Sequence, residues 1–396
     1  MEELRDYYRK ELFDRFFPNM DRYVVDHEYG GFMTTINSST GERLSSIKRA
    51  WHCGRGSWVY SFLYNNLKAD PRYLEIARKS VEFVMKNEPT DGNFWTDSFS
   101  REGKPVSSSG DIYGSLFVSE GLAEYAVASN QERYFDKAKA ILLDCMRAYD
   151  QPDYHYHIGY LSPDAPRIPG TRVLGHWMVF LNSATQILKH GDDPRIRTIA
   201  DRCVDAIMTH HMNSEYQLLN EGLNHDLSLP DNEIAQFVYT GHGIETLWMV
   251  LHEAIRRKDK ALFEQTHQTF KRHCEVARDR VYGGYFRCLD HVDDNRWKVD
   301  KVLWLQEEVL IGALCLIEHT DDPWAVECFV ETQDYVNRAF VREGDAFWMH
   351  AGDRTLSTCP TDRAEHYHHP RHLMYNLLAT ERMIERGGKL SGLFSH

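Results

Sequence analysis

Apolar residues recur at helical spacing through most of the chain, a pattern that predicts an all-α fold. The spacing is clear in WVYSFLYNNL, YLEIARKSVEFVMK, SLFVSEGLAEYAVA and YFDKAKAILLDCMRAY, and it continues to the closing segment RHLMYNLLATERMIER. The chain also starts with an amphipathic segment, MEELRDYYRKELFDRFF. Together these segments predict about a dozen helices separated by polar turns.

Short Gly and aromatic signals follow every second predicted helix. They stand at Gly30–Phe32, Gly92–Trp95, Gly159–Tyr160, Gly283–Phe286 and Gly344–Trp348. The signals fall about 60 residues apart, with a poorly marked copy near residue 220, and such a period indicates a repeat of helix, loop with short strands, and helix. Six such units predict a closed (α/α)6 barrel with a central pocket. An open helical scaffold for protein binding shares the period but usually lacks long aromatic loops.

Polar residues stand near the starts of alternate predicted helices, and in a barrel they would converge on the pocket from different inner helices. They are Arg55, Asp111, Glu120, His176, His242, Glu245, Glu308, His368 and Arg371.

His242 and Glu245, in YTGHGIETLW, are three residues apart and share a helix face. We therefore expect the Glu245 carboxylate to orient the His242 imidazole for proton transfer. Arg55 lies in an apolar stripe and needs an anionic partner, either a substrate oxygen or a structural carboxylate. Its neighbours Gly54 and Gly56 are expected to leave the guanidinium room to face a ligand.

Several candidates have a simpler structural interpretation. Glu308 lies on an apolar helix, where an unpaired charge is costly, so we expect it to hold Arg55 or a histidine. Glu307 is expected to face solvent, and Asp111 to cap its helix. His176 either binds substrate or only forms a hydrogen bond in the core.

The segment EHYHHPRHLMY contains His366, His368, His369 and His372, a cluster that invites a metal. The spacing does not fit the usual ligand sets, and Pro370 interrupts the run just before the last helix is expected to begin. We therefore expect His368 and Arg371 to face the pocket, and no metal. GxGxxG, P-loop, GxSxG and HExxH motifs are absent from the sequence.

Composition adds limits to this prediction. The 396 residues show no compositional break, which predicts one catalytic domain over residues 1–396. The net charge of −13 and the scattered Lys and Arg residues argue against nucleic-acid and membrane partners. No apolar run is long enough to span a bilayer, and eight cysteines without a C-x-x-C motif are typical of reduced core residues. We expect a cytoplasmic protein, and a homodimer is compatible with these features.

The motifs taken together resemble the N-acylglucosamine 2-epimerase family, which includes cellobiose and mannose 2-epimerases and related aldose-ketose isomerases. The resemblance rests on EYGGFMTTINSSTGE, KRAWHCGRGSWVYSFLY, YGSLFVSEGLAEYA, YTGHGIETLW, LWLQEEVLIGAL and YHHPRHL. It implies an (α/α)6 barrel with His242 and His368 as catalytic histidines and Arg55 as the pocket arginine. It further implies pocket roles for His176, Glu245 and Glu308, a sugar substrate and no cofactor.

The sugar itself stays open, because LWLQEE is similar to the cellobiose and mannose enzymes whereas YHHPR is similar to the N-acylglucosamine enzymes. We expect C2 epimerisation of a free aldose, with an N-acylglucosamine and N-acylmannosamine pair preferred. An aldose-ketose isomerase would use the same residues, and a glycoside hydrolase is a further alternative.

Overall fold

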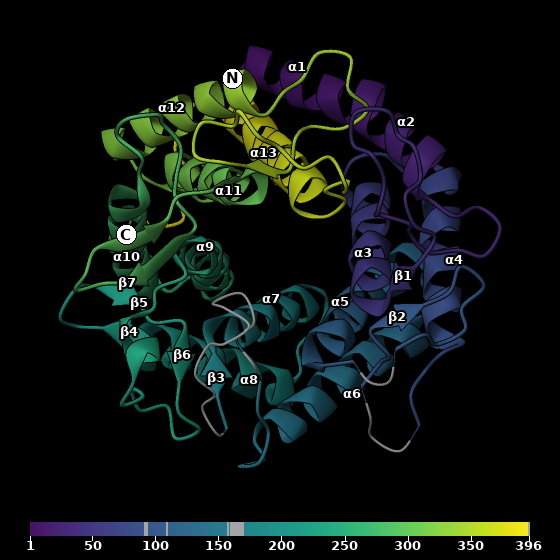
Figure 1. Cartoon of the computed structure of the whole chain (residues 1–396), viewed down its shortest axis with the longest axis horizontal. Coiled ribbons are helices and arrows are strands. Elements are labelled where there is room, and N and C mark those ends of the chain that lie inside the picture. Colours follow the sequence, from purple (N-terminus) through teal and green to yellow (C-terminus); the bar gives the residue numbers. More distant parts are fainter. Residues whose placement is uncertain (91–93, 108–109, 157, 159–169, 395–396) are drawn as a thin grey trace.

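The computed structural model describes residues 1–90, 94–107, 110–156, 158 and 170–394. Within these residues, helices form an inner and an outer ring (Figure 1). The inner ring consists of α3 (Ala50–Asn66), α5 (Ile112–Ser129), α7 (Leu174–His190), α9 (Thr240–Arg257), α11 (Leu303–His319) and α13 (His368–Glu385). Each inner helix packs against the next, and α13 packs against α3, so the ring closes. The predicted (α/α)6 barrel is confirmed.

The outer ring covers the inner helices from outside. Its helices are α4 (Pro71–Met85), α6 (Glu132–Tyr149), α8 (Pro194–Asp205, extended by η3, Ala206–His210), α10 (Lys260–Ala277) and α12 (Pro323–Ala339). The N-terminal segment lies beside α13 and runs through α1 (Glu2–Lys10), η1 (Glu11–Phe16), α2 (Phe17–Asn19) and η2 (Met20–Val24). η1 and η2 are π-helical, so the predicted N-terminal helix forms with two wider stretches.

Burial explains the apolar pattern from which the helices were predicted. Helix α5 is buried at every position from Ile112 to Ala126, because α3, α6 and α7 all pack against it. The outer helix α8 instead buries only Ile196, Ile199, Ala200 and Cys203, which form one stripe at helical spacing.

Asp-Pro pairs mark the starts of three outer helices. The side chains of Asp70, Asp193 and Asp322 each accept a hydrogen bond from the backbone N–H two residues later, at 2.9 to 3.0 Å. The proline that follows each aspartate occupies a first-turn position whose N–H has no partner within the helix. These caps fix where the outer helices begin.

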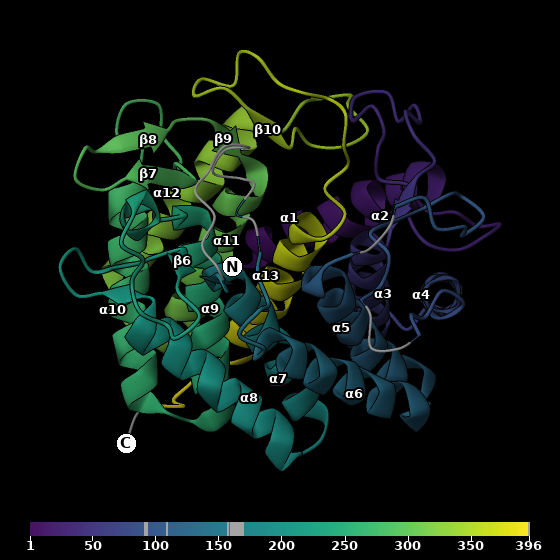
Figure 2. The same ribbon diagram turned by 60° about the horizontal axis from the view of Figure 1, so that its bottom comes forward.

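The helices are linked by small antiparallel sheets, and Figure 2 shows β7 to β10 together at one end of the barrel. The pairs are β1 (Lys48–Arg49) with β2 (Ser98–Phe99), β3 (Arg172–Val173) with β6 (Gly222–Leu223), β4 (Met212–Asn213) with β5 (Leu218–Leu219), β7 (Cys288–His291) with β8 (Arg296–Lys298), and β9 (Lys301–Val302) with β10 (Ala351–Gly352). Strands β1, β3 and β9 each lead directly into an inner helix. A short 3-10 helix, η4 (Glu233–Gln236), precedes α9.

A buried ion pair ties a glycine turn to the start of α11. Lys301 lies 3.0 Å from Asp279 and donates to the carbonyl of Gly283, while Arg354 closes over Asp279 at 2.9 Å. The same arrangement recurs before α3, with Asp26, Lys48, Gly30 and Arg101 in the corresponding places. Two of the predicted Gly signals therefore anchor inner helices that carry candidate site residues.

Three further expectations concern the remaining Gly signals, the cysteines and the length of the helices. The signals at residues 92–93 and 159–160 lie outside the described residues. All eight cysteines are free thiols, and all except Cys359 are buried, as expected. Among the described helices, none is long and apolar enough to cross a membrane.

Candidate active site

A cavity of about 520 Å³ lies at the end of the barrel where the inner helices begin. Four predicted site residues line it: Arg55, His242, Glu245 and His368. Aromatic side chains form much of the remaining wall, namely Trp51, Tyr113, Phe117, Tyr156, Tyr239 and Trp304. The structure therefore brings both predicted catalytic histidines and the predicted arginine to one cavity.

His242 lies in the first turn of α9, and a carboxylate fixes its ring. The Nδ1–H of His242 donates to Oε1 of Glu221 at 3.0 Å, and Glu221 is fully buried in the turn between β5 and β6. The prediction that Glu245 orients His242 is wrong. Because Glu221 occupies Nδ1, proton transfer by His242 would use Nε2.

His368 is the first residue of α13, and it also has a carboxylate partner. Its Nδ1 lies 2.8 Å from Oε1 of Glu308. Of the two partners expected for Glu308, Arg55 or a histidine, the structure shows the histidine. Burial lowers the pKa of His368 to about 3. The imidazole is therefore neutral at neutral pH and is available as a base.

Arg371 holds the two carboxylates beneath His368. Its Nη2 donates to Glu245 and to Glu308, in both cases at 2.6 Å. This ion pair explains why Glu245 turns away from His242, since a buried carboxylate gains more from a guanidinium than from an imidazole three residues away. Pro370 lies inside α13 and not before it, which the helix tolerates because first-turn N–H groups need no helical partner.

Arg55 is held by aromatic rings. Its guanidinium carbon lies 4.1 Å from the ring centroid of Phe117, 4.4 Å from that of Tyr367 and 4.8 Å from that of Trp51. No hydrogen bond or ion pair joins it to a carboxylate among the described residues, and its Nε is buried without a partner. Burial lowers the pKa of Arg55. A cation in this environment favours an anionic or oxyanionic ligand.

The glycines beside Arg55 have a different role from the one expected. A Cβ on Gly54 would lie 2.4 Å from the backbone oxygen of Phe117, and one on Gly56 would lie 2.1 Å from the Phe32 ring. They allow α3 to pack closely against α5 and the preceding loop, and they do not create space for the guanidinium.

Three predicted substrate-binding residues do not line the cavity. Glu308 and Arg371 are buried beneath His368. His176 is buried behind Tyr113 and Tyr156, with ring centroids 4.4 and 4.8 Å away, and neither of its ring nitrogens has a hydrogen-bond partner within the described part of the chain. Their direct contact with substrate has no support in this geometry.

The structure also tests the positions expected for Asp111 and Glu307. Asp111 caps α5, as expected, by accepting from the N–H of Tyr113 at 2.9 Å. Glu307, expected in solvent, is instead fully buried against α13. Helix α11 packs between α9, α12 and α13, so it has no solvent face at this position.

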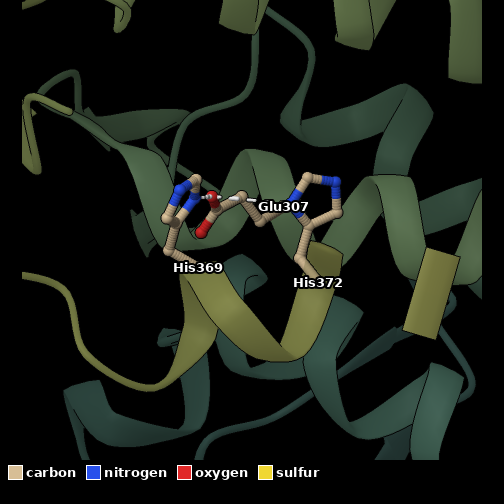
Figure 3. Close-up of side chains that lie close together, drawn as sticks. All are labelled: Glu307, His369 and His372. Atoms are coloured by element: carbon tan, nitrogen blue, oxygen red, sulfur yellow. Dashed lines mark hydrogen bonds and ion pairs between the residues drawn. The ribbon is translucent and has the colours of Figure 1, made fainter. Parts of the chain in front are cut away.

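The histidine cluster divides between the two sides of α13. His366 and His368 line the cavity, whereas His369 and His372 lie on the opposite side beside Glu307 (Figure 3). Glu245, Glu308 and His368 also lie close enough to hold an ion, but the Arg371 guanidinium already binds both of these carboxylates. The cluster therefore does not form one four-ligand site.

Sequence reasoning missed several residues of the site. Glu221 is the most important, and its signal was Gly222, which marks the weak repeat copy near residue 220. Trp304 was also missed, although its ring centroid lies 6.2 Å from that of His242 and 5.4 Å from that of His368. Tyr239 packs against His242 at 4.2 Å.

A second cavity of about 550 Å³ opens at the opposite end of the barrel, among the last turns of the inner helices. It contains none of the predicted site residues. Its cations are largely paired: Arg382 and Arg386 bind Glu318, and Arg256 binds Glu253. The first cavity is therefore the candidate active site.

The family model for N-acylglucosamine 2-epimerase (GlcNAc 2-epimerase) matches residues 30–370. The chain belongs to the N-acylglucosamine 2-epimerase family. The matched range includes all the predicted site residues except Arg371, which directly follows it.

Relatives and solved structures agree with this assignment. The N-acylglucosamine 2-epimerase of Bos taurus is 24% identical over 345 residues, covering 83% of this chain and 80% of the relative. The structure of the cellobiose 2-epimerase from Bacillus thermoamylovorans has a TM-score of 0.82 at 16% identity, covering 96% of this chain and 100% of the other. A D-mannose isomerase structure has a TM-score of 0.77 at 14% identity, covering 96% and 98%. At these identities the structures show a shared fold.

Proposed function

We propose that this family member interconverts the C2 epimers of a free aldose by proton transfer between two histidines. The observation that carries the proposal is the pair of imidazoles in one cavity, each bound through Nδ1 to a buried carboxylate. This arrangement supports a fixed ring orientation, and proton transfer would use Nε2 of each ring.

The reaction needs a base on one face of C2 and an acid on the other. In the open-chain sugar, one histidine removes the C2 proton, and the electron pair forms an enolate with the C1 carbonyl, which is an ene-diolate where C2 carries a hydroxyl group. The other histidine then donates a proton to the opposite face. His368 suits the base role in one direction because it is neutral.

Arg55 supplies the oxyanion stabilisation in this scheme. Its guanidinium stays protonated, lies against aromatic rings and lacks a carboxylate partner among the described residues. The charge that develops on O1 in the enolate would give it that partner, so Arg55 would bind the intermediate more strongly than the neutral sugar.

We favour an N-acylglucosamine and N-acylmannosamine pair as substrate, in agreement with the family model and the bovine relative. For a sugar with a hydroxyl group on C2, return of the proton to C1 would instead make a ketose, and the fold shared with D-mannose isomerase keeps that reaction as the alternative.

Glycoside hydrolysis fits the cavity less well. A hydrolase of this kind needs a carboxylic acid that can protonate the leaving oxygen. Of the carboxylates that line the cavity, Glu245 is paired with Arg371, Glu365 with Arg363, and Asp362 lies 3.5 Å from the His350 ring. Burial opposes ionisation of Glu365, but Arg363 and nearby histidines nevertheless hold its pKa below the usual range. Glu365 therefore stays ionised and is a poor general acid, and the Asp362 side chain is 71% exposed to solvent.

Proton NMR in D2O tests the proposed reaction. Incubation with N-acetylmannosamine, mannose, glucose and cellobiose should give C2 deuteration and the C2 epimer of one of them. A ketose product would favour the alternative, and absence of exchange with every sugar would refute the proposal.

The cytoplasmic location and the homodimer remain predictions from the sequence. Eight free thiols support a reducing compartment such as the cytoplasm. Sedimentation would test the homodimer.

A further inference from the structure

Two consecutive residues of α11 bind two consecutive residues of α13. Glu308 binds His368 on the cavity side, and Glu307 binds His369 on the side away from the cavity. Figure 3 shows the second group, with the Glu307 carboxylate between the rings of His369 and His372. The proposed reaction uses the first pair and gives the second no role.

The second pair is enclosed. Oε1 of Glu307 lies 2.6 Å from Nδ1 of His369, and both residues are almost completely buried. On the other side of the His369 ring, Nε2 lies 3.6 Å from the Glu11 carboxylate of η1. Phe16 and Trp348 cover the ring at centroid distances of 5.1 and 4.4 Å.

His369 and Glu307 carry opposite charges. Burial alone would lower the pKa of His369, but the carboxylates of Glu307 and Glu11 raise it to about 9. Burial alone would likewise raise the pKa of Glu307, but His369 lowers it to about 2. At neutral pH the pair is therefore an imidazolium and a carboxylate.

The remaining neighbours do not change this assignment. His372 lies with Nδ1 3.6 Å from Glu307, and its ring packs on the edge of Tyr8. Arg15 lies 3.2 Å from Oε1 of Glu11, the same oxygen that faces His369. Glu307 is thus the carboxylate that His369 contacts most closely.

A metal ion explains the geometry less well than a proton. Zinc bound at about 2.0 to 2.2 Å to each ligand would hold its ligand atoms more than 3 Å apart. The 2.6 Å contact between Glu307 and His369 is instead the length of a charge-assisted hydrogen bond.

We propose that Glu307 and His369 form a positioning pair that sets the place of His368 relative to Glu308. This inference rests on the proposed function. Since His368 and His369 are adjacent in the first turn of α13, a displacement of one moves the other. Since Glu307 and Glu308 are adjacent on α11, the outer ion pair also fixes the carboxylate that orients the catalytic ring.

The Glu307–His369 pair lies where it can control the geometry of the catalytic ring. It lies at the end of α11 and α13 that faces the substrate cavity, and it needs no contact with substrate. A displacement of about 1 Å between reacting groups can lower a rate about a hundredfold. Loss of the pair should therefore lower kcat, while KM stays nearly constant.

Glu318→Gln provides a matched control. Glu318 is also a buried carboxylate of α11 that pairs with α13, through Arg382, but it lies at the opposite end of the barrel. Both variants replace a carboxylate by an amide of the same shape and break an ion pair between the same two helices. A purely structural role predicts equal effects.

The test compares Glu307→Gln, His369→Gln, the double variant and Glu318→Gln by steady-state kinetics and thermal unfolding. We expect Glu307→Gln and His369→Gln each to lower kcat about tenfold to a hundredfold with KM within threefold. The double variant should lose no more than either single variant, because the pair acts as a unit. Glu318→Gln should lose stability but keep kcat.

Histidine NMR separates this inference from the proposed function. With 15N-labelled histidine, wild-type His369 should be an imidazolium at pH 7.5, and Glu307→Gln should both neutralise it and shift the His368 resonances. These signals do not require turnover, so they test the pair even if no sugar reacts. Unchanged His368 signals, kcat within twofold of wild type, or stoichiometric zinc lost in Glu307→Gln would each overturn the inference.

Discussion

Glu221→Gln is the most informative single substitution, because it keeps the shape of the side chain and removes its charge. The His242 imidazole must become an imidazolium when it accepts the C2 proton. Glu221, fully buried and 3.0 Å from Nδ1, would stabilise that charge. The amide can still accept the Nδ1–H bond but offers no negative charge.

The expected loss follows from this geometry. Hydrogen bonds to charged groups contribute about 1.5 to 3 kcal/mol. At 1.36 kcal/mol per factor of ten in rate, kcat should fall about tenfold to 150-fold. KM should change little, because Glu221 does not line the cavity.

Initial rates in both directions, measured by NMR on a reactive sugar, provide the assay. Glu253→Gln is the control, since Glu253 is a buried, ion-paired carboxylate at the opposite end of α9. That variant should lose stability and retain kcat. If Glu221→Gln kept kcat within twofold of wild type, or if Glu253→Gln lost as much, the orienting role of Glu221 would be wrong.

Three further results are expected. Arg55→Lys should lower kcat about 10²- to 10³-fold with little change in Tm, since the charge stays but the planar fork is lost; a large drop in Tm with kcat preserved would assign Arg55 to the scaffold. The stability that wild type has over Glu307→Gln should be greatest near pH 5 to 6 and should decrease toward pH 9, because the raised pKa of His369 stabilises the fold only while the ring is protonated; a constant difference in Tm would contradict the ion pair. Exhaustive EDTA treatment should leave turnover unchanged, and loss restored by a divalent ion would contradict a reaction carried by side chains alone.

The sequence predicted the architecture because each layer of the barrel has a characteristic pattern. Apolar residues recur at helical spacing both in outer helices such as α8, which bury one stripe, and in inner helices such as α5, which are buried on all sides. The period of the Gly signals then related Arg55, His242 and His368 to a common cavity. These signals are local in sequence, so they can be identified without a structure.

The partners of the site residues could not be predicted in the same way. Glu245 is three residues from His242, but its carboxylate binds Arg371, which is 126 residues away in sequence. Glu221 reaches His242 from a turn between two strands of two residues each, for which no periodicity exists. Glu307 lies on an apolar helix with no polar face to indicate solvent, and only contact with α13 shows that its charge is paired internally.

The central claim is that two histidines act on opposite faces of C2. The most direct measurement is C2 hydrogen exchange in D2O, starting separately from each epimer, with wild type, His242→Asn and His368→Asn. Wild type should exchange both epimers and interconvert them. Each variant should lose interconversion, and any exchange it retains should occur with one epimer only, a different one for each variant. Interconversion by either variant at near-normal rate, or exchange of both epimers by the same variant, would contradict the two-histidine account.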